Sequence, residues 1–147
     1  MPLSTAIYNV KGDEVMGFLQ TGDMLELYKR NYESGVLINL CLHKEFNSKY
    51  GLNMLYFSGV DQELGNVLTF GLGFFSNKST VSMWWVLNKF IEKCQLVKHP
   101  LRLVFAPLDK KLFPLLQKEL PHQCSLYSTT HSVVELTRKI TSTGSVV

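Results

Sequence analysis

Apolar and polar positions alternate most clearly in the middle of the chain, between residues 50 and 85. Two apolar runs of strand length, 52–60 and 66–75, are separated by a short polar segment, and this pattern predicts a β-hairpin. The spacing then becomes helical, because apolar residues recur at every third or fourth position from Val81 to Cys94. The residues that can cap the start of this helix are Ser76, Ser79 and Thr80.

Further apolar runs predict the rest of a sheet. Residues 36–42 and 101–106 are almost continuously apolar, which is typical of strands buried on both faces. A shorter run predicts another strand at 123–128. Two more helices are predicted, one capped by Asp23 and one capped by Asp109.

The chain as a whole reads as one domain with a short extension at each end. Residues 1–22 predict a hairpin extension, residues 23–140 the domain, and residues 141–147 a flexible tail. A last helix is predicted at about 130–140. After an opening helix, the elements of the domain follow the order βββαβαβα. This order predicts an α/β fold with a mixed five-stranded core sheet, helices on both faces, and an N-terminal hairpin plus helix.

Composition places the chain among globular proteins. Of its 147 residues, 46% are hydrophobic and 18% are charged, which excludes a disordered chain. No apolar run approaches the roughly 20 residues of a membrane-spanning helix, and the N-terminus lacks the pattern of a signal peptide. Cys41, Cys94 and Cys124 have no Cys-x-x-Cys spacing and read as reduced thiols. We therefore expect an intracellular protein without membrane contact.

A series of short motifs points to a known family. The motifs are Phe18-Leu19-Gln20-Thr21 with Met24, Lys49-Tyr50-Gly51-Leu52, Phe57-Ser58-Gly59-Val60-Asp61, Gly71 with Gly73, Ser76-Asn77-Lys78-Ser79, Trp85, Leu108-Asp109, Leu120-Pro121 and His131. In this order and spacing they resemble the transposase domain of Mutator-like elements, especially its domesticated relatives in proteins with SWIM-type zinc fingers. The resemblance implies a nuclear location. It also implies a ribonuclease H-like fold, and the element order above is the order of that fold.

The resemblance further implies a site for DNA cleavage by two metal ions, which carboxylates must hold about 4 Å apart. The first carboxylate, an Asp, corresponds here to Asn39, or to His43 if the alignment shifts. Ala106 or Pro107 stands in the place of the second. The third, a Glu, is expected beyond Val147. Neutral Asn offers a hard cation an oxygen but no charge, so we expect no catalytic activity, no bound metal and no cofactor.

Several other residues allow a functional or a structural interpretation. Asp61 and Glu63 fit a metal site less well than a turn, since Asp is a common turn residue. The pair Trp84 and Trp85 can stack on nucleic-acid bases, but its helical spacing favours the core. The residues that fit only part of a zinc site are His122, Gln123, Cys124 and His131, because no fourth ligand stands at the usual spacing. The resemblance also implies a Cys-x-x-His pair, of which His131 is present while Ser128 stands in place of the Cys.

Basic residues are spread thinly along the chain. Fifteen Lys and Arg are nearly balanced by twelve Asp and Glu, which gives a formal net charge of +3. Lys110 and Lys111 are the candidate phosphate contacts on a helix that also carries Lys118, although a solvated helix face is the favoured explanation. We therefore expect at most weak DNA binding.

These observations predict a catalytically inactive, transposase-derived domain that acts as a protein-interaction or scaffolding module. The protein partner is not identified by the sequence. One alternative is a nuclear DNA-binding module derived from a transposase. A second alternative is a small α/β enzyme whose site the sequence does not reveal.

Overall fold

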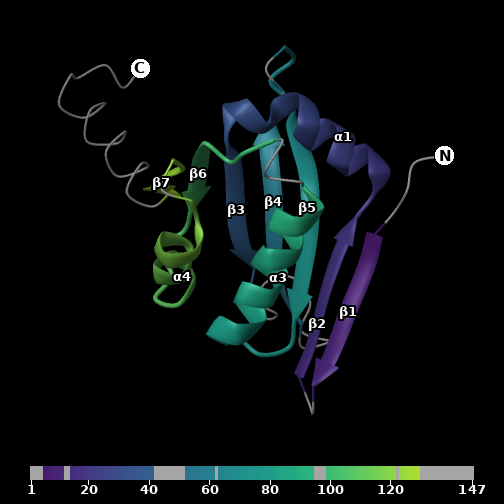
Figure 1. Ribbon diagram of the computed structural model, residues 1–147, viewed down its shortest axis with the longest axis vertical. Coiled ribbons are helices and arrows are strands. Elements are labelled where there is room, and N and C mark those ends of the chain that lie inside the picture. Colours follow the sequence, from purple (N-terminus) through teal and green to yellow (C-terminus); the bar gives the residue numbers. More distant parts are fainter. Residues whose placement is uncertain are drawn as a thin grey trace, which may run out of the picture.

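The computed structural model describes residues 5–11, 14–41, 52–61, 63–94, 99–121 and 123–129. The strands are β1 (Thr5–Lys11), β2 (Glu14–Gln20), β3 (Val36–Cys41), β4 (Asn53–Val60), β5 (Val67–Phe75), β6 (Leu103–Ala106) and β7 (Ser125–Ser128). The helices are α1 (Gly22–Asn31), α3 (Thr80–Lys93) and α4 (Leu112–Glu119), with a short 3-10 helix η1 (Tyr32–Ser34) after α1. The strands form one seven-stranded sheet in the order β1-β2-β5-β4-β3-β6-β7 (Figure 1).

The sheet is mixed, and its character changes at β3. Every neighbouring pair from β1 across to β3 is antiparallel, whereas β6 runs parallel to β3 and β7 runs parallel to β6. The predicted α/β class and mixed sheet are confirmed, and each of the five predicted core strands is present. The sheet has seven strands because β2 pairs with β5, which adds the N-terminal hairpin to the same sheet.

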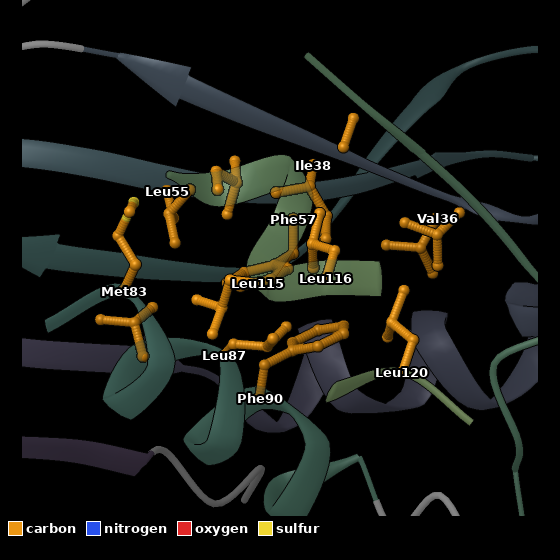
Figure 2. Close-up of a cluster of buried hydrophobic side chains, with 14 of the residues drawn as sticks. Val36, Ile38, Leu55, Phe57, Met83, Leu87, Phe90, Leu115, Leu116 and Leu120 are labelled. Carbon is orange, nitrogen blue, oxygen red and sulfur yellow. The ribbon is translucent and has the colours of Figure 1, made fainter. Parts of the chain in front are cut away.

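Helices α3 and α4 cover one face of this sheet. The inward side chains of these helices include Met83, Leu87, Phe90, Leu115, Leu116 and Leu120 (Figure 2). The side chains of the sheet that face them include Val36, Ile38, Leu55 and Phe57. The ring of Phe90 stacks on that of Phe57, with centroids 4.1 Å apart. Helix α1 adds the buried Tyr28, whose ring meets Phe90 edge-on at 5.7 Å. One hydrophobic core therefore joins all three helices to the sheet.

Gly73 of β5 allows α3 to lie close to the sheet. A Cβ atom at this position would lie 2.0 Å from Cγ1 of Val86, well inside van der Waals contact. Only a residue without a side chain fits there unless the helix or the strand moves. The packing of α3 thus explains Gly73, one of the two glycines in the Gly71–Gly73 motif on which the resemblance partly rests.

Polar side chains cap the first two long helices. The Oγ1 atom of Thr21 accepts a hydrogen bond from the N–H of Met24 at 3.1 Å, so Thr21 is the cap of α1. The prediction that Asp23 caps this helix is wrong. Asp23 lies in the first turn, where its negative charge interacts favourably with the helix dipole. Ser79, one of the predicted candidates, caps α3 through a 3.1 Å hydrogen bond from the N–H of Ser82.

Helix α4 begins at Leu112, and Lys111, at its N-cap position, forms no side-chain cap hydrogen bond. The predicted cap, Asp109, lies two residues before Lys111 and holds the turn that leads into the helix. The Oδ2 atom of Asp109 accepts hydrogen bonds from the N–H groups of Lys111 and Leu112, at 3.0 and 2.9 Å. Pro114 lies in the first turn, where the N–H that proline lacks would have no intrahelical partner. The leucines of α4 are buried and its Lys118 is exposed, as predicted. Lys110 and Lys111, which were predicted on this helix, are exposed but precede its first residue.

None of the described helices covers the opposite face of the sheet. The half-buried apolar side chains on that face include Leu19, Leu37, Cys41, Met54, Tyr56, Leu72, Phe74, Leu103 and Phe105. Strand β3 was predicted to be buried on both faces. Among the described residues, the face with Val36 and Ile38 is buried, whereas Leu37 on the other face is only half-buried. The predicted helix at 130–140 and the predicted tail at 141–147 lie outside the described residues.

Candidate functional site

The two positions at which the resemblance expects metal-binding carboxylates lie toward the same end of two neighbouring parallel strands. Strands β3 and β6 are parallel neighbours, with Leu37 opposite Phe105. Continuing this register by two residues places Asn39 beside Pro107, the residue that follows β6. The fold therefore brings together two positions that are far apart in the sequence.

Neither of these positions offers a charged oxygen. Asn39 is half-buried on the open face of the sheet, opposite Tyr56 of β4. Ala106 is completely buried, and Pro107 is half-buried. His43, the alternative to Asn39, lies outside the described residues. A hard cation at this place would meet the neutral amide of Asn39 and no carboxylate from either strand.

Asp109 follows β6 by three residues, and its carboxylate is already engaged. Its side chain is only 12% exposed and forms an ion pair with Lys78, from the connection between β5 and α3. The second carboxylate oxygen accepts hydrogen bonds from the N–H groups of Lys111 and of Leu112, the first residue of α4. Both oxygens of Asp109 are thus held by contacts within the protein.

These contacts set the pKa of Asp109. Burial raises it, but the hydrogen bond from Lys78, the backbone N–H groups of Leu112 and Lys111, and the charge of Lys78 lower it by more. The pKa of Asp109 is therefore below its ordinary value, and the carboxylate is ionised at neutral pH. An ionised carboxylate paired with Lys78 is a structural link between two connections of the chain.

Two further lysines lie close to this pair. The Nζ atom of Lys111 donates a hydrogen bond to the backbone oxygen of Lys78 at 2.8 Å. Lys110 is exposed. We call Lys78, Asp109, Lys110 and Lys111 the lysine corner. Two of its three ammonium groups are held by the protein itself, so only Lys110 presents its charge to solvent without such a contact among the described residues.

The two tryptophans of α3 lie in different surroundings. Trp85 is half-buried, packs against the core, and has the Nζ atom of Lys89 above its ring at 5.5 Å from the centroid. Trp84 is 40% exposed. The structural interpretation thus holds for Trp85, whereas Trp84 is available for contacts with another molecule.

Asp61 has the turn role that its residue type predicts. Its Oδ1 atom accepts hydrogen bonds from the N–H groups of Glu63 and Leu64, at 2.8 and 3.3 Å. Gly65 closes the turn with a φ of 73°, a conformation that favours glycine. The carboxylate of Asp61 is therefore used in building the β4–β5 turn, and Glu63 is exposed beside it.

The proposed fragments of a zinc site are not assembled in the described residues. Gln123 is exposed and Cys124 is half-buried, while His122 and His131 lie outside the described part of the chain. No group of three or more His, Cys, Asp or Glu side chains lies close enough to hold a metal ion within the described ranges. Ser128 is buried in β7.

The three thiols differ in their access to solvent. Cys94 is fully buried, and burial raises its pKa to about 12, although a hydrogen bond from Gln20 opposes this shift. Burial also raises the pKa of the half-buried Cys124. At neutral pH these two groups are thiols and not thiolates, so neither is suited to nucleophilic chemistry.

Two hollows lie near the first residues of β6 and β7. The larger, of about 470 Å³, is lined by Pro100, Leu101, Arg102, Pro121 and Gln123, and we call it the end hollow. The smaller, of about 220 Å³, shares Pro121 and also includes Cys124. Among the described residues, both are lined mainly by apolar side chains and neither by a carboxylate.

The sequence analysis did not single out the exposed apolar residues of the β4–β5 turn. Val60 is 50% exposed, Leu64 is 73% exposed and Val67 is 70% exposed. We call these three residues the apolar tip. In the sequence they appear as Leu64 inside a turn, with Val60 at the end of β4 before it and Val67 at the start of β5 after it.

None of the helices in the described ranges is both long enough and apolar enough to cross a lipid bilayer. Comparisons with family models, with curated proteins and with solved structures gave no match to this chain.

Proposed function

We propose that this chain is a catalytically inactive ribonuclease H-like domain, derived from a Mutator-like transposase, that acts through contacts with proteins. The proposed fold is supported by three antiparallel strands, β3 to β5, followed along the chain by a helix, a strand parallel to β3, a helix and another parallel strand. This is the element order from which the ribonuclease H-like fold was inferred.

The observation that carries the loss of activity is the environment of Asp109. Two divalent cations near a phosphate need several anionic oxygens, because the ions must be held at close separation against their mutual repulsion. The adjoining positions Asn39 and Pro107 supply no anionic oxygen. The nearby carboxylate of Asp109 is neutralised by Lys78 and occupied by the start of α4.

Protein contacts are favoured over DNA by the way charge and apolar surface are distributed. Duplex DNA is bound through many phosphate contacts, and each contact needs a free positive charge. At the lysine corner, two of the three lysines already bond to the protein. A further carboxylate, that of Glu14, lies at this end of the sheet and accepts a hydrogen bond from Asn77 at 3.3 Å.

A calorimetric titration with Mg²⁺ and Mn²⁺ tests the missing catalytic site. We expect the unaltered chain to show no binding tighter than millimolar. The matched variant is Asn39→Asp combined with Pro107→Asp, which returns an anionic oxygen to each strand and is expected to strengthen binding. Submillimolar binding by the unaltered chain, with DNA cleavage that Asn39→Ala abolishes, would show that the site is active.

The specific alternative is a DNA-binding module that uses the lysine corner together with the exposed Trp84. Fluorescence anisotropy of a labelled duplex at two salt concentrations separates the two functions. We expect dissociation constants of roughly 10⁻⁴ to 10⁻⁶ M at physiological salt, the ordinary non-specific range. The double reversal Lys110→Glu and Lys111→Glu should then weaken binding no more than the control reversal Lys29→Glu and Arg30→Glu on α1. Nanomolar affinity that only the first reversal abolishes would establish the DNA-binding function instead.

A further inference from the structure

The apolar tip is an unusual surface for a protein without a partner. Val60 and Val67 are direct cross-strand partners, and Leu64 lies in the turn that joins their strands. The side chains of Val60 and Val67 therefore adjoin each other, and Leu64 lies in the short turn between them. The turn projects beyond α1 at the top of the view in Figure 1, so the patch is presented outward at one end of the sheet.

The turn that presents Leu64 is fixed by its own hydrogen bonds. Besides the two bonds to its carboxylate, Asp61 accepts a 2.9 Å bond from the N–H of Gly65 at its backbone oxygen. The N–H of Asp61 donates to the backbone oxygen of Asn66 at 2.8 Å. Because the turn is already ordered, burying Leu64 in another molecule costs little conformational entropy.

The end hollow lies at the same end of the sheet as the apolar tip. Strand β4 runs antiparallel to β3, so the end of β4 lies beside the start of β3. Strands β6 and β7 run parallel to β3, so their starts lie at that end too. The residues that line the end hollow directly precede these two strands. Strand β3 alone separates β4 from β6 in the sheet.

The charges beside the tip and the hollow are opposite. Glu63 is exposed next to Leu64, and residues 60–67 contain no Lys or Arg. Arg102 is exposed and, among the described residues that line the end hollow, is the only charged one. An acidic tip is repelled by anionic lipid surfaces and by nucleic acid, whereas it complements a hollow with a basic rim.

We propose that two copies of this chain bind end to end, each inserting its apolar tip into the end hollow of the other. Leu64 is the inserted side chain, and Glu63 pairs with Arg102 of the second copy. Because each copy carries both the tip and the hollow at one end, a two-fold axis satisfies both contacts at once and closes the assembly as a dimer. This inference rests on the proposed function only in that both require protein contacts.

The dimer is expected to be weak. A tip and a hollow on each copy form an interface at or below the lower limit of specific complexes, where association is transient. Sedimentation velocity of the full chain over a range from about 10 μM to 1 mM should therefore show a monomer that becomes a dimer as the concentration rises.

Leu64→Asp tests the inserted side chain. We expect it to weaken association by at least tenfold, because the charge would enter an apolar hollow. The control is Val81→Asp, which makes a similar change at a residue that is 64% exposed in the first turn of α3, far along the sheet from the tip. An acidic residue is well tolerated there, and the control should dimerise like the unaltered chain.

A charge exchange tests the pairing itself. Glu63→Arg and Arg102→Glu should each weaken association about tenfold, because like charges then face each other twice in the dimer. The double variant restores opposite charges and should restore association. This recovery cannot arise from a folding defect, and circular dichroism of each variant confirms that it is folded.

Four results would overturn the exchange of tips. They are a chain that stays monomeric up to 1 mM, a dimer that Leu64→Asp leaves unchanged, a dimer lost through Val81→Asp, and a charge exchange without recovery. Open-ended polymers would also contradict the closed two-fold arrangement. A monomeric chain with only weak DNA affinity would leave the proposed function intact, whereas nanomolar DNA affinity would refute that function whatever the oligomeric state.

Discussion

The two ends of the sheet use their side chains in opposite ways. At the lysine corner, charged groups bond to one another and to backbone atoms, so that Asp109 and Lys78 connect the start of α3 to the start of α4. At the other end, the hydrogen-bonding groups of Asp61 are also used internally, but the turn that they build displays apolar side chains. The first end is a structural joint and the second is a presented surface. Residue type alone did not distinguish them, since each end has an aspartate at its centre.

The largest effect is expected from breaking the packing that supports the lysine corner. Gly73→Val places a branched side chain against Val86 and should destabilise the fold by about 3 kcal/mol, because α3 must move away from the sheet. Urea unfolding followed by circular dichroism measures this change. The control at the other end is Gly65→Ala, where no atom lies within 4 Å of the added Cβ and only the positive φ opposes it, at about 1 kcal/mol. Equal losses in the two variants would contradict the packing argument.

A smaller effect is expected from removing the aspartate at each end. Asp109→Ala should cost about 2 kcal/mol, because it removes the acceptor of two backbone N–H groups at the start of α4 and leaves Lys78 without its ion pair. Asp61→Ala removes hydrogen bonds in an exposed turn and should cost about 1 kcal/mol. The midpoints of thermal unfolding rank the two variants. If Asp61→Ala were the more damaging, the β4–β5 turn and not the lysine corner would be the structural joint.

The smallest effect is the change of stability with pH that the ionisation of Asp109 causes. Its pKa is lower in the folded protein than the ordinary value of about 3.9, so its stabilising contribution is complete above that value. The contribution is lost as the pH falls through the folded-state pKa. Asp109→Asn should therefore be less stable than the unaltered chain by about 1 kcal/mol at pH 6, and the difference should shrink as the pH falls through the folded-state pKa of Asp109. A difference that is constant with pH would show that the charge of Asp109 does not contribute.

Much of the fold followed from the sequence because the apolar pattern is strong where the core is. The runs at 36–42, 52–60 and 66–75 became β3, β4 and β5 with shifts of at most one residue at each boundary. The start of α1 was misplaced, because Thr21 and Asp23 are both good caps and local preference does not choose between them. The joining of the N-terminal hairpin to β5 depends on a pairing between distant strands, which no local pattern reports.

The candidate site was predictable only in part. The resemblance named Asn39 and Pro107, and the parallel pairing of β3 with β6 places them together. The sequence suggested Lys110 and Lys111 as phosphate contacts, but it could not show that Lys111 bonds to the backbone of Lys78. The apolar tip was missed because a single leucine in a turn carries little weight until its exposure is known.

The short ladder between β3 and β6 has a consequence for how the molecule opens. Only two residue pairs join these strands, whereas β4 and β5 are paired along their whole length. The unit formed by β6, α4 and β7 is thus held to the rest of the sheet by this ladder, by core contacts of α4, and by the bonds of the lysine corner. Amide hydrogen exchange should therefore detect this unit detaching as a cooperative block, at a lower free energy than global unfolding, while the antiparallel strands remain protected.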